Sequence, residues 1–271
     1  MAELADRQDR NGCILGRVRS TQQTGEAVLD RAFRLLDILG TSNTPLGLSE
    51  ISLRADMPKA TTYRLLKQLT SLGAIERRGE WYLLGHHLFT LGATVATQRR
   101  LREAALPLMA ELSQSLRQVV HLGVLDAGAV LQIEKVLPRR HHGALASLGS
   151  RRPAHATALG KAILAFLPAD ELAQHCQGEL KRYTRYTVTD HATLTRQLAR
   201  VRACGFAVEH EEWVPGVCCA AAPIGQAGTR PIAGLSVSGP IATFKAEQAA
   251  PSVRDAADEI GKLVGTIFQA R

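Results

Sequence analysis

The sequence predicts two domains of different class, a small, mainly α-helical domain and a larger α+β domain, joined by a helix. The 271 residues exceed one average domain and suit two. Apolar residues recur at helical spacing up to Gly73, and short alternating runs interleave with helical ones from Val119 onward. The expected parts are a flexible tail at 1–25, a first domain at 26–85, a linker helix at 86–105 and a second domain at 106–271.

The composition indicates a globular protein with a polyanionic partner. Hydrophobic residues make up 45% of the chain and charged residues 21%, which is ample for two packed cores. The formal net charge of +8 favours nucleic acid or an anionic membrane as partner. Aromatic residues reach only 4%, which argues against a protein that stacks single-stranded bases.

The cysteines and the apolar runs indicate the compartment. The five cysteines are scattered and form no C-x-x-C pair, a pattern typical of a reducing compartment rather than a disulfide framework or zinc site. Residues 1–25 are polar and lack the apolar core of a signal peptide. No apolar run reaches the ~18–20 residues of a membrane span. We therefore expect a soluble, cytoplasmic protein with no membrane partner.

The first domain is predicted to begin with two helices. In "AVLDRAFRLLDIL" (27–39), the apolar residues expected on one face are Val28, Leu29, Ala32, Phe33, Leu36 and Leu39. A turn-rich break at 40–47 leads to "LSEISLRA" (48–55), a second helix that Ser49 is expected to cap. The residues expected to point inward from this helix are Leu48, Ile51, Ser52 and Ala55.

The stretch "MPKATTYRLLKQLTSLGA" (57–74) predicts a third helix after a tight connection. Pro58 suits its first turn, where a missing N–H costs nothing, and Gly73 suits its C-terminal cap. The residues expected to anchor the helix are Leu65, Leu66, Leu69 and Leu72. The following "AIERRGEWYLLG" predicts strands at 74–77 and 81–84 around a turn.

Two helices around a tight turn, followed by a hairpin, are the order of a winged helix-turn-helix, whose second motif helix lies in the major groove of DNA. Lys67 and Gln68 alone would suit an ordinary solvated helix, and Tyr63 is expected to pack rather than read a base. The ordered set nevertheless predicts binding to double-stranded DNA. The predicted DNA-contacting residues are Ser49, Lys59, Thr61, Thr62, Tyr63, Arg64, Lys67, and Arg77 and Arg78 at the hairpin tip.

The rest of the chain alternates helices and strands. Residues 86–118 are expected to form a helix that is broken at Pro107, joins the domains and also dimerises. The expected strands are two around 126–128, one near 144–148, "FAVEHEE", "GVCCAAAPI" and "PIAGLSVSG". The expected helices are "TALGKAILAFL", "TLTRQLARVRACG" and a final one at about 246–269.

Four segments resemble the IclR family of bacterial transcriptional regulators. They are "LSEISLRADMPKATTYRLLKQLTSLGAIER", "GSRRPAHATALGKAILAFLP", "GFAVEHEEWVPGVCCAAAPI" and "IAGLSVSGP". The resemblance covers the chain from about Ala27 to the C-terminus. It implies a winged helix-turn-helix joined to a GAF-like effector-binding domain, assembly as dimers or dimers of dimers, and an effector pocket beside the sheet of the second domain.

The resemblance also implies the residues that line the effector pocket. They are Ala144, Ala158, Leu159, Glu209, Val217, Cys219, Ser236 and Ser238. Glu209 stands where the family often has aspartate, and the hairpin tip is short compared with many members. Cys219 is expected to be a small pocket residue rather than a nucleophile.

The residues around this pocket also have a physical interpretation. In "RRPAHATALGK", which contains His155, Thr157 can cap a helix whose free N–H groups would bind a small carboxylate, although a plain capped core helix also fits. Ser236 and Ser238 share one strand face, where a polar ligand would supply hydrogen-bond partners. Glu209 would either accept a hydrogen bond from a ligand hydroxyl or serve only as a structural partner.

The sequence favours neither a metal site nor an enzyme. The adjacent pairs His86–His87 and His141–His142 lack the spacing of helical metal ligands. No nucleophile signature surrounds Cys219, so we expect no catalytic residue and no cofactor. The prediction is a dimeric, ligand-responsive transcriptional regulator of a near-palindromic operator, with repression the more usual role. A DNA-tethered protein-interaction regulator without a small-molecule ligand is the alternative.

Overall fold

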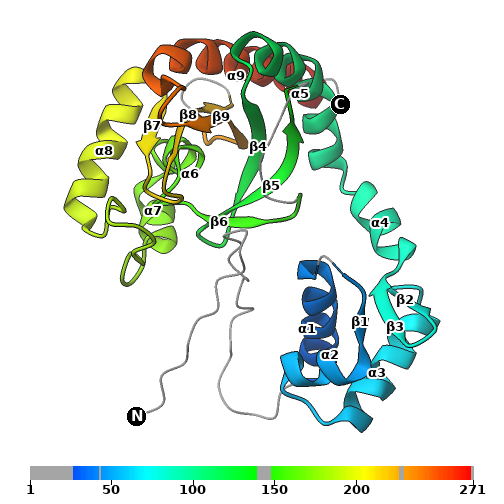
Figure 1. Cartoon of the computed structure of the whole chain (residues 1–271). Coiled ribbons are helices and arrows are strands. Elements are labelled where there is room, and N and C mark those ends of the chain that lie inside the picture. Colours follow the sequence, from blue (N-terminus) through cyan, green and yellow to red (C-terminus); the bar gives the residue numbers. More distant parts are fainter. Residues whose placement is uncertain (1–26, 43, 139–147, 226–228, 270–271) are drawn as a thin grey trace. The chain divides into compact units, whose positions relative to one another are not determined.

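The computed structural model describes residues 27–42, 44–138, 148–225 and 229–269 (Figure 1). The described residues form two compact units, 27–99 and 100–269. The expected tail at 1–25 lies outside the described residues. Among the described helices, none combines the length and the apolar character that crossing a bilayer requires.

The first unit has the predicted order of elements. Its helices are α1 (Val28–Thr41), α2 (Leu48–Ala55), α3 (Lys59–Ser71) and α4 (His86–Ala93). Its strands are β1 (Leu46–Gly47), β2 (Ile75–Arg78) and β3 (Trp81–Leu84), which form an antiparallel sheet in the order β1-β3-β2. This is a winged helix-turn-helix, as the sequence predicted.

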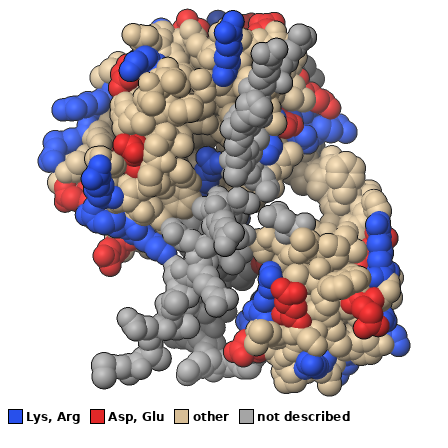
Figure 2. All heavy atoms as spheres, in the orientation of Figure 1, with Lys and Arg blue, Asp and Glu red and all other residues tan. Residues whose placement is uncertain are grey.

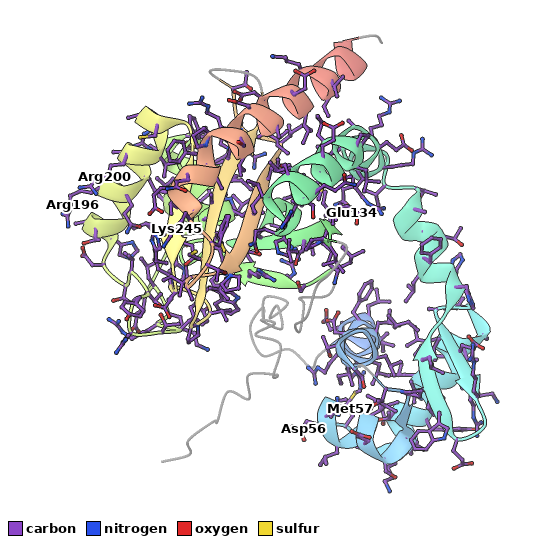
Figure 3. The ribbon with its side chains drawn as sticks, turned by 45° about the horizontal axis from the view of Figure 1, so that its top comes forward. Asp56, Met57, Glu134, Arg196, Arg200 and Lys245 are labelled. Carbon is purple, nitrogen blue, oxygen red and sulfur yellow. The ribbon has the colours of Figure 1, made fainter. Side chains whose placement is uncertain are left out.

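The turn between α2 and α3 is held by hydrogen bonds around the buried Ser52. The Ser52 hydroxyl donates to the carbonyl oxygen of Met57 at 2.6 Å, and the Met57 N–H donates back to the Ser52 carbonyl at 3.1 Å. Asp56 between them has a left-handed backbone with φ of 50°, which reverses the chain at once (Figure 3). These contacts set the direction in which α3 leaves α2.

Several packing predictions for the first unit were wrong. Phe33 is 61% exposed and Leu29 72% exposed, because the buried side of α1 is the one that carries Leu35 and Leu39. Leu72 is 68% exposed because α3 ends one residue before it. Ser49 does not cap α2, because the helix begins directly after β1 and makes Ser49 its second residue.

The helix break after the hairpin also differs from the prediction. It lies at Thr94–Val95, and Pro107 is inside α5 (Ala96–Leu116). The turns on both sides of Pro107 bury Ala105 and Met109 completely in the core of the second unit. This packing outweighs the local cost of a proline. The expected domain boundary after residue 105 therefore falls within a continuous helix.

The second unit is built on one antiparallel sheet in the order β6-β5-β4-β9-β8-β7 (Figure 1). Its strands are β4 (Val119–Asp126), β5 (Ala129–Val136), β6 (Arg151–Pro153), β7 (Ala207–His210), β8 (Val217–Ile224) and β9 (Ala233–Pro240). The expected strand near 144–148 lies largely outside the described residues, and β6 is the strand observed next to β5.

Helices cover both faces of this sheet. α5 and α9 (Ala246–Gln269) pack on one face through a large apolar core. α6 (Ala158–Leu164), α7 (Ala169–His175), which the sequence did not predict, and α8 (His191–Cys204) pack on the other. We call this second side the α6 face. The second unit is thus an α+β domain, as predicted.

Candidate functional site

The exposed side of α3 carries the predicted cations. Lys59, Arg64 and Lys67 are exposed, and in the part of the chain that the structure describes no ion pair engages them. Leu65 and Leu66 on the opposite side are buried in the core of the first unit. The helix therefore presents a basic side to solvent while its leucines fix it to the domain.

Two predictions for polar residues of α3 change with the structure. Thr62 is completely buried, and its hydroxyl donates to the carbonyl oxygen of Pro58 at 3.1 Å, so it faces the core and not DNA. Tyr63 is 44% exposed, so it lies on the open side instead of packing. Thr61 is partly exposed and keeps a position at the open side.

The hairpin between β2 and β3 places both predicted arginines at its tip. Arg77 donates to the Gly79 carbonyl at 2.8 Å, and its guanidinium lies 5.7 Å from the centre of the Tyr82 ring. Arg78 forms an exposed ion pair with Glu76 at 2.8 Å, which lowers the pKa of that carboxyl. The visible side of this unit carries both basic and acidic side chains (Figure 2). Arg78 is thus engaged in an ion pair, whereas the described part of the chain shows no ion pair for the cations of α3.

On the α6 face, the strand register brings three of the predicted effector residues into one row. Glu209 on β7 is opposite Cys219 on β8, and Cys219 is opposite Ser238 on β9. Ser236 lies two residues from Ser238 and therefore points to the same face. The prediction that Ser236 and Ser238 share one face of a strand is confirmed.

Glu209 is a buried carboxyl group near its neutral form. Only 3% of the residue is exposed, and this burial raises its pKa from 4.5 to about 7. The Glu212 N–H donates to its Oε2 at 2.9 Å, and Cys219 shares a hydrogen bond with it. Desolvation and the neighbouring Glu209 raise the pKa of the Cys219 thiol well above 9.0. The thiol is thus protonated at neutral pH and does not resemble an activated nucleophile.

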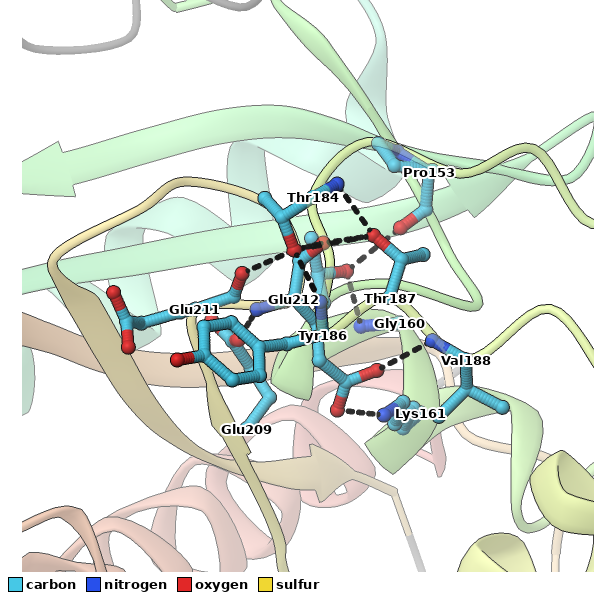
Figure 4. A network of polar contacts seen from close by, with 11 residues as sticks. Pro153, Gly160, Lys161, Thr184, Tyr186, Thr187, Val188, Glu209, Glu211 and Glu212 are labelled. Carbon is cyan, nitrogen blue, oxygen red and sulfur yellow. Dashed lines mark hydrogen bonds and ion pairs between the residues drawn. The ribbon is translucent and has the colours of Figure 1, made fainter.

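A buried ion pair borders this row (Figure 4). The ammonium group of Lys161 on α6 contacts the carboxylate of Glu212, and both residues are almost fully buried. The segment around Glu212 is also fixed by the hydroxyls of Thr184 and Thr187. They donate to the carbonyl oxygens of Glu211 and Glu212 at 2.7 and 2.6 Å respectively. The lysine charge is therefore neutralised inside the protein and is not offered to an anion.

The start of α6 differs from the expected anion site. Thr157 does cap the helix, as predicted, and its hydroxyl oxygen accepts the Gly160 N–H at 3.2 Å. The cap itself thus uses one of the donors expected to bind a carboxylate. Gly160 is required here, because an added Cβ would lie 2.2 Å from the carbonyl oxygen of Ala154.

The remaining predicted pocket residues have different positions. Ala158 and Leu159 are buried in α6, and Val217 is the partly exposed first residue of β8. His155 binds the carbonyl oxygen of Lys181 through Nε2 at 3.0 Å, and burial lowers its pKa. Ala144 lies outside the described residues.

The sequence did not single out the other polar residues beneath this row. Ser150, Gln132 and His121 are at least nine-tenths buried and connect to Ser238 through side-chain hydrogen bonds. A polar residue within an apolar strand, as in "VVHLGV" and "AVLQIE", was the available signal. Among the described residues, no group of histidine, cysteine and acidic side chains is arranged to hold a metal ion.

The two units together define a class of protein, a DNA-binding transcriptional regulator with a second, α+β domain. More specifically, the chain belongs to the IclR family. The model described as "Bacterial transcriptional regulator IclR C-terminal" matches residues 93–262, and "IclR helix-turn-helix domain" matches residues 28–79. The family consists of transcription regulators and not of enzymes.

Several characterised relatives are similar along most of their length. The regulator KdgR of Escherichia coli is 35% identical over 80% of this chain and 84% of its own. The repressor AllR of Klebsiella pneumoniae is 30% identical over 94% of this chain and 96% of its own. An IclR homologue from Microbacterium hydrocarbonoxydans, complexed with 4-hydroxybenzoate, superposes with a TM-score of 0.80 at 28% identity, covering 89% of this chain and 100% of its own.

The raised pKa of Glu209 predicts a pH-dependent stability. Between about 4.5 and 7, the folded chain holds a proton that the unfolded chain has released, so the free energy of unfolding falls as pH rises through this window. Glu209→Gln should remove this pH dependence, which amounts to about 3 kcal/mol in the free energy of unfolding across the window. Urea unfolding at several pH values measures it. The exposed Glu179→Gln is the control and should retain the slope; equal slopes in both variants would contradict the assignment.

Proposed function

We propose that this chain is a ligand-responsive repressor that binds a near-palindromic operator as a dimer or a dimer of dimers. Its effector is a small carboxylate held on the α6 face. It works in the cytoplasm, where its DNA target lies. The observation that carries the proposal is the row Glu209, Cys219 and Ser238, polar groups that adjacent strands bring together on the helix-covered α6 face.

The α3 helix supports the DNA-binding half of the proposal. Family membership establishes a helix-turn-helix that binds DNA, and the exposed Lys59, Arg64 and Lys67 supply cations for phosphates. Thr61 is the hydroxyl best placed to read a base edge, because Thr62 is buried. Two copies of α3 in a dimer would read the two half-sites of the operator.

The chemistry of the α6 face supports a carboxylate effector. Ser236 and Ser238 offer hydroxyl donors, and Glu209 is about half protonated near pH 7, so it repels an anion less than an ordinary carboxylate would. A relative has been solved with 4-hydroxybenzoate, which is a carboxylate. A repressor is also among the relatives.

Effector binding changes operator affinity only if the effector has different affinities for the DNA-competent and DNA-incompetent arrangements. We propose that the linker region at 86–105 changes between the two. It contains the break at Thr94–Val95 between α4 and α5, where few helical hydrogen bonds resist bending.

Replacing Arg64 by Ala should weaken binding to operator and random DNA alike, because a phosphate contact carries no sequence information. The slope of log affinity against log salt should become shallower by about one. Fluorescence anisotropy at several salt concentrations measures both effects. Arg200→Ala, an exposed arginine on α8 of the second unit, is the matched control, and equal slopes for the two variants would refute the contact (Figure 3).

The two neighbouring threonines provide a matched pair for base reading. Thr61→Val should reduce discrimination at one operator position by roughly 1–3 kcal/mol if its hydroxyl contacts a base edge. Thr62→Val should leave the preferred sequence unchanged, because that side chain is in the core. Selection from randomised DNA compares the two variants. An unaltered motif for Thr61→Val would remove that residue from base recognition.

The effector site is tested by separating ligand response from DNA binding. Short-chain and aromatic carboxylates, 4-hydroxybenzoate among them, are screened for a rise in melting temperature, since a ligand of the folded state stabilises it by mass action. Ser238→Ala should reduce the response to the best carboxylate about tenfold or more and leave operator affinity in its absence unchanged. A normal response in this variant would show that the site lies elsewhere.

A further inference from the structure

We call Glu209, Cys219 and Ser238 the effector row. Three polar side chains lie buried next to this row, on the strands towards β6, and have no role in the function proposed so far. Ser150 is 6% exposed, and Gln132 and His121 are each 4% exposed. Ser150 lies beside β6, Gln132 on β5 and His121 on β4, so they occupy successive positions across the sheet. Buried polar groups of this kind need hydrogen-bond partners, and here they find them in one another.

The hydrogen bonds form a continuous chain that ends at Ser238. The Ser150 hydroxyl donates to Oε1 of Gln132 at 3.3 Å. The amide nitrogen of Gln132 contacts Nδ1 of His121, and Nε2 of His121 is 3.0 Å from the hydroxyl of Ser238. Ser238 is only partly buried and lies next to Cys219 in the effector row.

The chemistry of these groups gives the chain a direction. In the structure the amide of Gln132 turns its nitrogen towards Nδ1 of His121, and because an amide nitrogen only donates, Nδ1 accepts in this arrangement. In a neutral imidazole the proton is then on Nε2, which donates to the oxygen of Ser238. Because this oxygen already accepts, the single hydroxyl proton of Ser238 is directed to another acceptor.

We propose that Ser150, Gln132 and His121 are positioning residues that fix Ser238 as a hydrogen-bond donor to an acceptor oxygen of the effector. The site thereby selects a carboxylate or carbonyl oxygen at this point over an N–H group. This inference rests on the proposed function, because it assumes that the effector contacts Ser238. It adds which residues determine that Ser238 donates, rather than accepts, the hydrogen bond to the effector.

In a serine hydrolase, a similar set of groups has the opposite direction of hydrogen bonding. There a carboxylate accepts the Nδ1 proton, so Nε2 is free to take the proton of the serine. Here an amide donates to Nδ1, so the imidazole N–H donates a hydrogen bond to the Ser238 oxygen and does not accept the hydroxyl proton. Ser238 is thereby made a donor for binding and not a nucleophile.

The direction is measured first without any ligand. Long-range proton–nitrogen NMR of the ¹⁵N-histidine-labelled full chain reports which imidazole nitrogen carries the proton, and His121→Gln identifies the signal. We expect protonated Nε2 and unprotonated Nδ1 in the wild-type chain. A proton on Nδ1 would overturn the inference whatever the ligand results are.

Gln132→Glu should reverse the direction of these hydrogen bonds, because a carboxylate accepts from Nδ1 and leaves Nε2 to accept from Ser238. The pH is raised until NMR shows this inverted tautomer. The affinity for the best carboxylate of the panel should then fall about tenfold or more relative to the wild type at the same pH, since Ser238 presents lone pairs to an anion. Glu134→Gln, on the same strand but paired with Arg102 at 2.7 Å on the α5 side, is the control and should change neither tautomer nor affinity (Figure 3).

The outcomes separate this inference from the proposed function. An inverted tautomer with unchanged carboxylate affinity overturns the inference and leaves the carboxylate effector standing. If no carboxylate of the panel binds the wild type although the tautomer is as expected, the proposed effector class fails and the inference fails with it. If Gln132→Glu does not fold, Gln132→Met removes the donor at similar volume. That variant should show mixed tautomers and several-fold weaker binding, and a tautomer and affinity equal to wild type overturn the inference.

Discussion

The close packing of α6 against the sheet is the constraint on which the second unit depends. An added Cβ on Gly234 would lie 3.0 Å from the side chain of Leu159, so the side chains of α6 pack directly onto the backbone of β9 at this position. Water is excluded from most of this face, and each polar group on it must find a partner or give up its charge. Lys161 therefore pairs with Glu212, and Glu209 has a pKa near neutrality. The polar chemistry of the site follows from this exclusion of water.

The alternation of side chains along the strands gives the sheet two different faces. One packs in the apolar core with α5 and α9, and the other carries polar groups. On β9, Leu235 and Val237 point into the core with α5 and α9, whereas Ser236 and Ser238 point to the α6 face. This pattern is readable in "GLSVSG", and for that reason the sequence alone predicted that Ser236 and Ser238 share one face of the strand. Strand alternation is local, and local patterns are what a sequence displays.

The features that the sequence did not predict depend on contacts between distant residues. Thr62 looks like a surface residue of a polar helix, yet it is completely buried in a unit where α3 packs against α1 and α2. Lys161 is buried because Glu212, 51 residues further along the chain, meets it. Pro107 stays helical because Ala105 and Met109 are buried around it. In each case, tertiary packing outweighed a residue's ordinary preference.

The same alternation connects the effector side of the sheet to the helix that leads back to the first unit. His121 faces α6, while its neighbours Val120 and Leu122 are completely buried in the core that also contains Leu101 and Met109 of α5. A ligand that moves β4 at His121 must therefore also move side chains that contact α5, since a close-packed core does not absorb a shift locally. Only two residues separate α5 from α4, and α4 belongs to the DNA-binding unit. The strand β4 thus carries His121 on the α6 face and, at the neighbouring positions, side chains of the core that α5 shares.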